Sequence, residues 1–176
     1  AVTQYGALTP TPPPPASPGS LKDVVLGFND FNNYYENNPY FGAIIGRYGN
    51  RISNGTFLLD GVRYELEQNN GTNSLHGGLV GFDKVFWKFI EEKSSNQSLY
   101  FEYYSKDMEE GFPGNLVVGV EYILNDSNEL KIKYTASTDK KTIINLTQHS
   151  YFNLSGESSG DISVSYTHLR AHETTP

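Results

Sequence analysis

Four short runs of aromatic, aliphatic and β-branched residues follow one another through the second half of the sequence, and they constrain the fold more than any other feature. They cover residues 89–93, 99–104, 115–124 and 130–137. The gaps between them hold the turn-forming clusters SSN, EEGFPG and NDSN. Short strands joined by such turns are typical of an antiparallel sandwich or barrel. With 13 Tyr and 10 Phe, which fit a pleated and half-buried surface, the chain is predicted to be all-β.

Segments in the first half of the sequence fit the same class. Residues 56–66 are predicted to form a hairpin, because an Asp-Gly pair lies between two apolar runs and is a strong two-residue turn signal. Residues 2–8 and 21–28 are predicted to be strands, the second one buried because of its short apolar run. Residues 31–38 are predicted to be a short helix or a loop.

Residues 9–20 are rich in proline and interrupt this order of strands. Proline has no N–H to donate to a sheet, so an exposed polyproline-like loop is expected. The alternative is a ligand for an SH3-type domain, but the basic flank that such ligands usually carry is missing.

The composition argues against several classes of function. Twenty acidic and 13 basic residues give a formal charge of −7, so the chain lacks the electrostatic footprint of a nucleic-acid-binding protein. It has no run of about 18 apolar residues and no charged-then-apolar leader, so neither a membrane span nor a signal peptide is expected. Cysteine is absent, which removes disulfides, thiolate zinc sites and cysteine nucleophiles.

A polar cluster surrounds His149 in the stretch NLTQHSYFNLSG at residues 145–156. An imidazole can donate or accept a proton near neutral pH, and the neighbouring amide and hydroxyl groups can bond to the hydroxyls of a ligand. A β-rich run at residues 142–146 leads into this stretch. The cluster favours a polyol-binding site, with a buried histidine satisfied inside a sheet as the alternative.

The same stretch bears on the compartment. Sequons begin at Asn145 and Asn153, where a glycan would obstruct a binding site. This favours a compartment without glycosylation, and we expect a cytoplasmic protein. A secreted or periplasmic location stays open should a leader be missing, and the sequence leaves the oligomeric state open.

Residues 40–52, YFGAIIGRYGNRI, form a second candidate region. Its glycines permit positive φ or close backbone approach, but it contains neither the Rossmann pattern nor a membrane-length apolar segment around GxxxG. A loosened strand or loop that presents Arg47, Asn50 and Arg51 is therefore predicted. Arginine beside asparagine can bind vicinal hydroxyls through its fixed donor geometry; a surface pair that solubilises a loop is the alternative.

A second histidine, His76, ends the turn-rich stretch NNGTNSLHGG at residues 69–78. Binding residues concentrate in loops that a rigid scaffold holds, so His76 is a further candidate. His168 and His172 have the i, i+4 spacing of helical metal ligands, but no Glu completes an HExxH pattern. We expect no metal site there and a disordered end instead.

Five motifs resemble, in order, those of the aldose 1-epimerase family, whose members are also called galactose mutarotases. They are YFGAIIGR with NRI, NSLHGG, GFDK with Trp87, EGFPG, and NLT with HSYFNL. The resemblance spans residues 2–162 and implies a large antiparallel β-sandwich, here truncated. It further implies an isomerase that interconverts the α and β anomers of free hexoses such as galactose and glucose, without metal or organic cofactor.

The resemblance assigns roles to four residues. His149 matches the general acid that protonates the ring oxygen, a role that suits an imidazole, and His76 matches a second histidine that hydrogen-bonds near the same oxygen. Asn50 and Arg51 match residues that hold sugar hydroxyls. The expected catalytic residues are thus His149 and His76, and the expected substrate-binding residues are Asn50 and Arg51.

The sequence also departs from the family pattern. The family's general base is a glutamate well toward the C-terminus, and neither it nor a later sugar-binding aspartate has a counterpart here; Glu157 and Asp161 match no catalytic position. Residues 1–162 are expected to be part of the family domain, and residues 163–176 a foreign tail, disordered or artefactual. The chain is accordingly expected to be an inactive fragment with aggregation-prone unpaired strand edges.

Two alternative functions differ in the residues that they require. A non-catalytic carbohydrate-binding module would keep the same four residues for recognition without turnover. A glycoside hydrolase would need two carboxylates flanking the scissile bond, and no such pair is recognisable.

Overall fold

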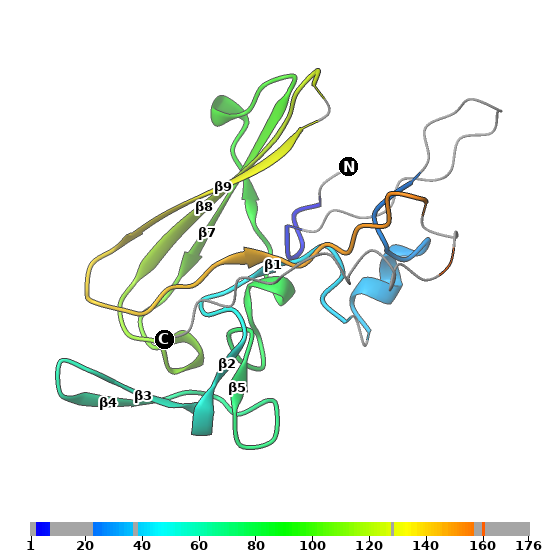
Figure 1. The fold of residues 1–176 in the computed structure, drawn as a ribbon. Helices are drawn as coiled ribbons and strands as arrows, with labels where there is room; N and C mark the ends of the chain where they lie inside the picture. The colour runs from blue at the N-terminus through cyan, green and yellow to red at the C-terminus, as the bar shows by residue number, and fades with distance from the viewer. Residues whose placement is uncertain (1–2, 8–22, 37–38, 128, 157–159, 161–176) are drawn as a thin grey trace.

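The computed structural model describes residues 3–7, 23–36, 39–127, 129–156 and 160, which form strands and short 3-10 turns (Figure 1). The largest sheet has four antiparallel strands in the order β6-β7-β8-β9. Their bounds are β6 Lys88–Phe89, β7 Ser98–Ser105, β8 Leu116–Leu124 and β9 Leu130–Thr138. The predicted meander is confirmed by this sheet.

Three two-stranded antiparallel sheets carry the rest of the regular structure. They pair β1 Ile44–Ile45 with β10 Thr147–Gln148, β2 Arg51–Ile52 with β5 Ser74–Leu75, and β3 Thr56–Leu59 with β4 Val62–Glu65. The 3-10 turns are η1 Phe31–Tyr34, η2 Ser53–Gly55, η3 Phe82–Lys84, η4 Glu91–Lys93 and η5 Glu109–Gly111. In the part of the chain that the structure describes, no helical segment has the length and apolar character of a membrane span.

The β3–β4 hairpin confirms the prediction for residues 56–66. Its turn has φ of +50° at Asp60 and +80° at Gly61. Positive φ at both central residues is what a type I′ turn requires, and Asp-Gly is among the pairs that adopt it with least strain. The helical alternative for residues 31–38 also proved right, since η1 lies there.

One face of the four-stranded sheet supports the main core. Along β8, Leu116 and Val118 are fully buried while Val117 between them is 37% exposed, which is the alternation of a half-buried strand. Buried side chains from other elements pack against this face: Ala7, Ile44, Phe82 and Trp87. Each large apolar side chain buried in this way contributes about 1.5–3 kcal/mol. The core therefore fixes β1 and η3 onto the sheet.

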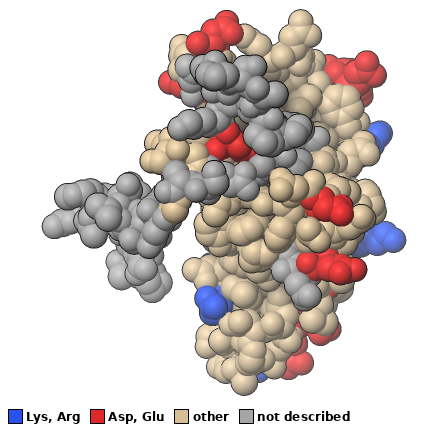
Figure 2. All heavy atoms as spheres, turned by 90° about the vertical axis from the view of Figure 1, so that its right-hand side faces the viewer, with Lys and Arg blue, Asp and Glu red and all other residues tan. Residues whose placement is uncertain are grey.

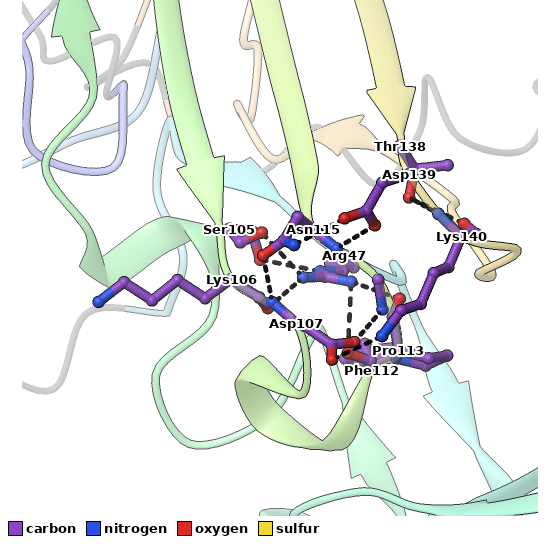
Figure 3. A network of polar contacts seen from close by, with 11 residues as sticks. Arg47, Ser105, Lys106, Asp107, Phe112, Pro113, Asn115, Thr138, Asp139 and Lys140 are labelled. Atoms are coloured by element: carbon purple, nitrogen blue, oxygen red, sulfur yellow. Dashed lines mark hydrogen bonds and ion pairs between the residues drawn. The ribbon is translucent and has the colours of Figure 1, made fainter.

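Arg47 ties the segment after β1 to the end of the four-stranded sheet (Figure 3). Its side chain is only 2% exposed, and its Nε donates to Oγ of Ser105 over 2.8 Å. Its Nη atoms donate to four backbone carbonyls, those of Ser105 (3.2 Å), Lys106 (2.7 Å), Phe112 (3.4 Å) and Pro113 (3.0 Å). The expectation that the loop presents Arg47 beside Asn50 and Arg51 was wrong, because its donors all face inward.

The buried strand predicted at residues 21–28 is not formed in its described part. Val25 makes one isolated bridge, to Phe152, and residues 23–28 are half-buried. Two further backbone hydrogen bonds join the same segments, from Leu26 to Tyr151 and from Asn153 to Val24. A short apolar run indicates burial but not a regular partner, and the partner here is a loop.

Three further strand predictions were right only in part. In residues 89–93, β6 ends at Phe89 and η4 follows. Residues 142–146 make a single bridge, between Asn145 and Tyr48, and the regular pairing begins only at β10. In the described part of residues 2–8, a bridge between Tyr5 and Phe86 is the strand-like pairing that is present.

The described residues exclude several segments that the sequence singled out. These are the proline-rich loop at residues 9–20, Glu157, Asp161, and the tail at residues 163–176 with His168 and His172. Figure 2 shows one face of the molecule, on which acidic side chains are scattered and the basic ones lie apart from one another.

Candidate functional site

Two of the short sheets bring together loops that are distant in the sequence. His149 directly follows β10, and its N–H donates to the carbonyl of Ala43, beside β1 (2.8 Å). His76 directly follows β5, and its N–H donates to the carbonyl of Asn50, beside β2 (3.1 Å). Since β1 and β2 lie in one short stretch of chain, the two histidines are held on a common frame. In Figure 1 the orange segment that contains β10 runs beside β1 across the middle of the molecule.

The imidazoles of His76 and His149 are neighbours. Their ring centroids lie 5.3 Å apart, with the ring planes almost perpendicular at 87°. Both side chains are half-buried. They can therefore reach a single ligand from adjacent positions while their other faces are packed against protein.

A hollow of about 950 Å³ lies in front of the two rings. It is lined by Gly49, Asn50, His76 and residues 145–155. Its lining combines imidazole, amide and hydroxyl groups with the aromatic rings of Tyr151 and Phe152. Such a mixture suits a ligand with many hydroxyls and a small apolar face. No Asp or Glu is among the described residues that line it.

A hydrogen bond from the backbone of another residue orients the imidazole of His76. The backbone N–H of Asn50 donates to Nδ1 of His76 over 2.9 Å, so Nε2 is the nitrogen that carries the proton. Burial, followed by the charges of His149, Arg51 and Lys84, lowers the pKa of His76 to about 4. His76 is therefore a neutral hydrogen-bond donor at physiological pH.

Asn50 and Arg51 lie at the edge of the hollow, but only Asn50 lines it. The amide oxygen of Asn50 accepts from the N–H of Arg51 (3.0 Å) and from Nη1 of Arg51 (3.4 Å). Nε of Arg51 donates to Oδ1 of Asn70 over 2.8 Å. The Arg51 guanidinium thus lies across the loop, beside the hollow, and is exposed to solvent.

No role is predicted from the sequence for the residues that hold the His76 loop. The Asn69 amide donates to the carbonyls of Leu75 (2.9 Å) and Gly78 (2.7 Å), and its oxygen accepts from the N–H of Leu75 (2.7 Å). The Glu110 carboxylate accepts from the N–H groups of Leu79 (2.7 Å) and Val80 (3.0 Å). Neither residue type indicates such a role by itself, because both are common on exposed loops.

Three non-glycine residues at the site have left-handed backbone. These are Tyr40 (φ +66°), Asn50 (φ +68°) and His76 (φ +55°). Asparagine tolerates this region, but tyrosine and histidine pay for it with strain of about 1–3 kcal/mol. Residues with such backbone are held by their surroundings. His76, for example, is held by hydrogen bonds at its backbone N–H and at its ring Nδ1.

The described residues contain no group of three His, Cys, Asp or Glu side chains that could hold a metal ion. Among the residues that the structure describes, no third side chain of that kind joins the two imidazoles in such a group. The arrangement is suited to hydrogen bonding and proton transfer by the imidazoles themselves.

The chain matches known proteins along most of its length. A family model described as aldose 1-epimerase matches residues 4–176. The galactose mutarotase of Bos taurus is 50% identical over 144 residues, which are 82% of this chain and 41% of that protein. The aldose 1-epimerase of Escherichia coli K12 is 41% identical over 145 residues, again 82% of this chain and 41% of that protein. The chain spans about two fifths of the length of these curated relatives.

A solved structure shares the fold. The crystal structure of an aldose epimerase homologue from C. elegans superimposes with a TM-score of 0.77 at 32% identity, covering 86% of this chain and 46% of that one. Together with the strand content, this likeness confirms the prediction of an all-β, sandwich-like fold. Because the family model matches nearly the whole sequence, the chain belongs to the aldose 1-epimerase family.

Proposed function

We propose that this chain carries the acid side of an aldose 1-epimerase active site, which interconverts the α and β anomers of free hexoses such as galactose and glucose. The observation that carries the proposal is the pair of imidazoles, 5.3 Å apart, over a hollow lined by amides and hydroxyls. The names of the relatives, galactose mutarotase and aldose 1-epimerase, support the same reaction.

The chemistry accounts for two imidazoles with different tasks. Opening a pyranose requires a proton on the ring oxygen while another proton leaves the anomeric hydroxyl, after which C1 rotates and the ring recloses. In the proposal, protonated His149 donates to the ring oxygen, and the reverse transfer accompanies ring closure. Neutral His76 donates its Nε2–H hydrogen bond toward the same oxygen, since Nδ1 is occupied by the N–H of Asn50. General acid catalysis of this kind contributes roughly 10²–10⁴-fold in rate.

The proposed sugar contacts divide between two residues. Asn50 lines the hollow, and its side chain would meet a hydroxyl of the bound sugar. Arg51 would reach the sugar only by turning away from Asn70, its present partner. A bidentate contact of the Arg51 guanidinium with vicinal hydroxyls would offset the loss of that hydrogen bond.

The base for the anomeric hydroxyl is not provided by the described lining, which holds no carboxylate. We therefore propose that the 176-residue chain by itself binds hexoses but turns them over poorly. A small carboxylate added in solution should stand in for the missing base. Acetate has a pKa close to that of a glutamate side chain and can enter an open hollow.

Polarimetry tests this proposal. The relaxation of freshly dissolved α-D-glucose or α-D-galactose is followed in buffer, with the chain, with acetate, and with both. We expect the chain and acetate together to relax the sugar faster than the sum of their separate effects. The variant His149→Asn should abolish this synergy, while Arg63→Gln, on the exposed β4 strand, should retain it.

A second candidate, a non-catalytic carbohydrate-binding module, is favoured by the same absence of a carboxylate from the described lining. It predicts binding of galactose or glucose with no acceleration under any of these conditions. Isothermal titration with both sugars, run beside the polarimetry, separates the two functions. Absence of both binding and acceleration would contradict each of them.

We also propose a cytoplasmic location. The sequon asparagines Asn145 and Asn153 both line the hollow, and Asn153 is only 3% exposed. A glycan on either one would fill the hollow or prevent the loop from packing. Expression through a glycosylating secretory pathway should therefore yield protein that either lacks glycans at these positions or fails to bind sugar, as mass spectrometry and titration would reveal.

A further inference from the structure

The ring of Tyr40 packs against both imidazoles of the candidate site. Its centroid lies 4.8 Å from that of His76, edge to face at 75°, and 5.5 Å from that of His149, at 34°. With the 5.3 Å between the two histidines, the three rings form a closed triangle. The lining of the hollow includes both imidazoles but not Tyr40, so Tyr40 contacts the histidines without facing the hollow.

The backbone around Tyr40 is joined to that of His149. The carbonyl of Tyr40 accepts from the N–H of Ala43 (3.1 Å), which closes a tight turn, and the carbonyl of His149 accepts from the N–H of Gly42 (3.3 Å). Tyr40 has a φ of +66°, a conformation that costs a tyrosine about 1–3 kcal/mol. The turn therefore holds the backbone of Tyr40 in one place relative to that of His149.

The Tyr40 ring also lies close to a cation, the ammonium of Lys84. Nζ of Lys84 is 5.4 Å from the centroid of the Tyr40 ring, within the range of a cation–π contact. The ammonium is held by the Asp83 carboxylate, at 2.8 Å from Oδ2, and that carboxylate is only 8% exposed. Lys84 is thus fixed near the ring triangle by a buried anion.

We propose that Tyr40 is a positioning residue for the two histidines, and that its ring, rather than its hydroxyl, sets the angle between them and shields His76 from water. The proposal rests on the proposed function in that the two imidazoles are taken to be the pair that meets the sugar. It adds a residue that acts through the histidines and not by touching the ligand.

The surroundings of His76 explain why a shielding ring matters. The charged and titratable groups near it are His149, Arg51, Lys84 and Tyr40, with Asp83 paired to Lys84. Burial is the first cause of the lowered pKa of His76, ahead of all charges. Removing the Tyr40 ring admits water, and the pKa of His76 should then rise toward its ordinary value of 6.5.

The experiment is an NMR titration of the imidazoles in the 176-residue chain. Tyr40→Phe keeps the ring and removes the hydroxyl, whereas Tyr40→Leu removes the ring. We expect Tyr40→Phe to leave the His76 titration and both imidazole signals near those of the wild type. Tyr40→Leu should raise the pKa of His76 by about one unit or more, because water then reaches the imidazole. It should also displace both imidazole signals, because the ring current of Tyr40 is lost. Tyr104→Leu is the matched control, since Tyr104 is 52% exposed on β7.

Two outcomes would overturn the proposal. One is a Tyr40→Leu variant whose imidazole signals and His76 pKa match the wild type. The other is a Tyr40→Phe variant that behaves like Tyr40→Leu, which would assign the effect to the hydroxyl. Should Tyr40→Leu not fold, nuclear Overhauser contacts in the wild-type chain decide: the Tyr40 ring protons must contact both imidazoles, and their absence would refute the arrangement.

A galactose titration of the same samples keeps the two proposals separate. If galactose moves the imidazole signals of the wild type, the sugar site is supported independently of Tyr40. If galactose moves nothing while Tyr40→Leu still changes the His76 titration, the proposed function fails and the positioning role stands. The reverse result, sugar binding with no effect of Tyr40→Leu, leaves the function intact and removes Tyr40 from it.

Discussion

The backbone N–H of Asn50 donates to Nδ1 of His76 over 2.9 Å. A ring nitrogen that accepts a hydrogen bond carries no proton, so this contact selects the neutral tautomer with the proton on Nε2. We expect the nitrogen chemical shifts of His76 to report that tautomer across neutral pH, in a ¹H–¹⁵N spectrum of the labelled chain. A spectrum showing a protonated Nδ1 at pH 7 would contradict the arrangement.

The same histidine makes stability depend on pH. Its folded-state pKa is about 4, against an ordinary value of 6.5. Between these two pH values the unfolded chain binds the proton and the folded chain does not, so the free energy of unfolding falls as the pH is lowered from 6.5 toward 4. Urea denaturation across this range should show the decline.

The contribution of His76 is isolated by a variant. Carboxylates titrate at acid pH as well, for example Asp107, whose pKa is lowered by its hydrogen bond to Lys140. Subtracting the profile of His76→Gln from that of the wild type removes these shared effects. A difference that is flat between pH 4 and pH 6.5 would show that His76 is not shielded as described.

The four-stranded sheet and the β3–β4 hairpin could be predicted from the sequence because their signals are local. The alternation along β8, from buried Leu116 to exposed Val117, and the Asp60-Gly61 turn each depend on neighbouring residues only. Residues 21–28 gave the same apolar signal, yet their partner is an irregular loop. A run of apolar residues does not carry information about what it will pair with.

The residue types of the candidate site could be predicted from the sequence, but the residues that hold the site in place could not. His76 and His149 stand in polar, turn-rich stretches, which sequence alone can identify. Arg47 lies three residues before Asn50 in the same motif, and nothing local distinguishes a guanidinium that binds four carbonyls from one that faces solvent. Tyr40 likewise acquires its place only when three distant segments meet.

Asn69 is expected to hold the His76 loop through three hydrogen bonds to the backbone of Leu75 and Gly78. Asn69→Asp preserves the shape but replaces the amide donor, which faces two carbonyls, by a carboxylate oxygen. We expect this variant to unfold at a lower temperature and to shift the His76 signals. The reason is that the carboxylate oxygen and the two carbonyl oxygens are all negatively polarised and repel one another. Asn96→Asp, in the exposed turn before β7, is the control and should do neither.

Gly77 is expected to tolerate no side chain. Its φ is +95°, and a Cβ there would overlap the carbonyl oxygen of Gly46. Gly71 is a matched control in the preceding turn: its φ is +62°, but nothing lies within 4 Å of a Cβ. Gly71→Ala should therefore lose only the roughly 1–2 kcal/mol typical of a Cβ in left-handed backbone, while Gly77→Ala should lose clearly more in thermal unfolding. Equal losses of stability in the two variants would mean that the close approach of Gly77 to Gly46 adds nothing to the cost of a side chain there.

Arg47 is expected to be the single polar side chain whose loss most weakens the described fold, because five hydrogen bonds converge on its guanidinium. In Arg47→Met the carbonyls of the buried residues Ser105 and Pro113 and the part-buried carbonyl of Lys106 lose this donor, while the carbonyl of Phe112 keeps the N–H of Met108. Since an unsatisfied buried polar group costs about 1–3 kcal/mol, the free energy of unfolding should fall by more than about 3 kcal/mol.

Arg47→Lys tests geometry apart from charge. A lysine ammonium has three donors on one atom and cannot reproduce the planar fork that reaches both Ser105 and Pro113. It should therefore rescue only a minor part of the loss. Arg63→Met is the control, because Arg63 forms an exposed ion pair with Glu65, a type that contributes about 0–1 kcal/mol. Urea denaturation of the three variants gives the order: if Arg47→Lys matched the wild type, positive charge alone would suffice, and the network of directed hydrogen bonds would not be what joins the site to the sheet.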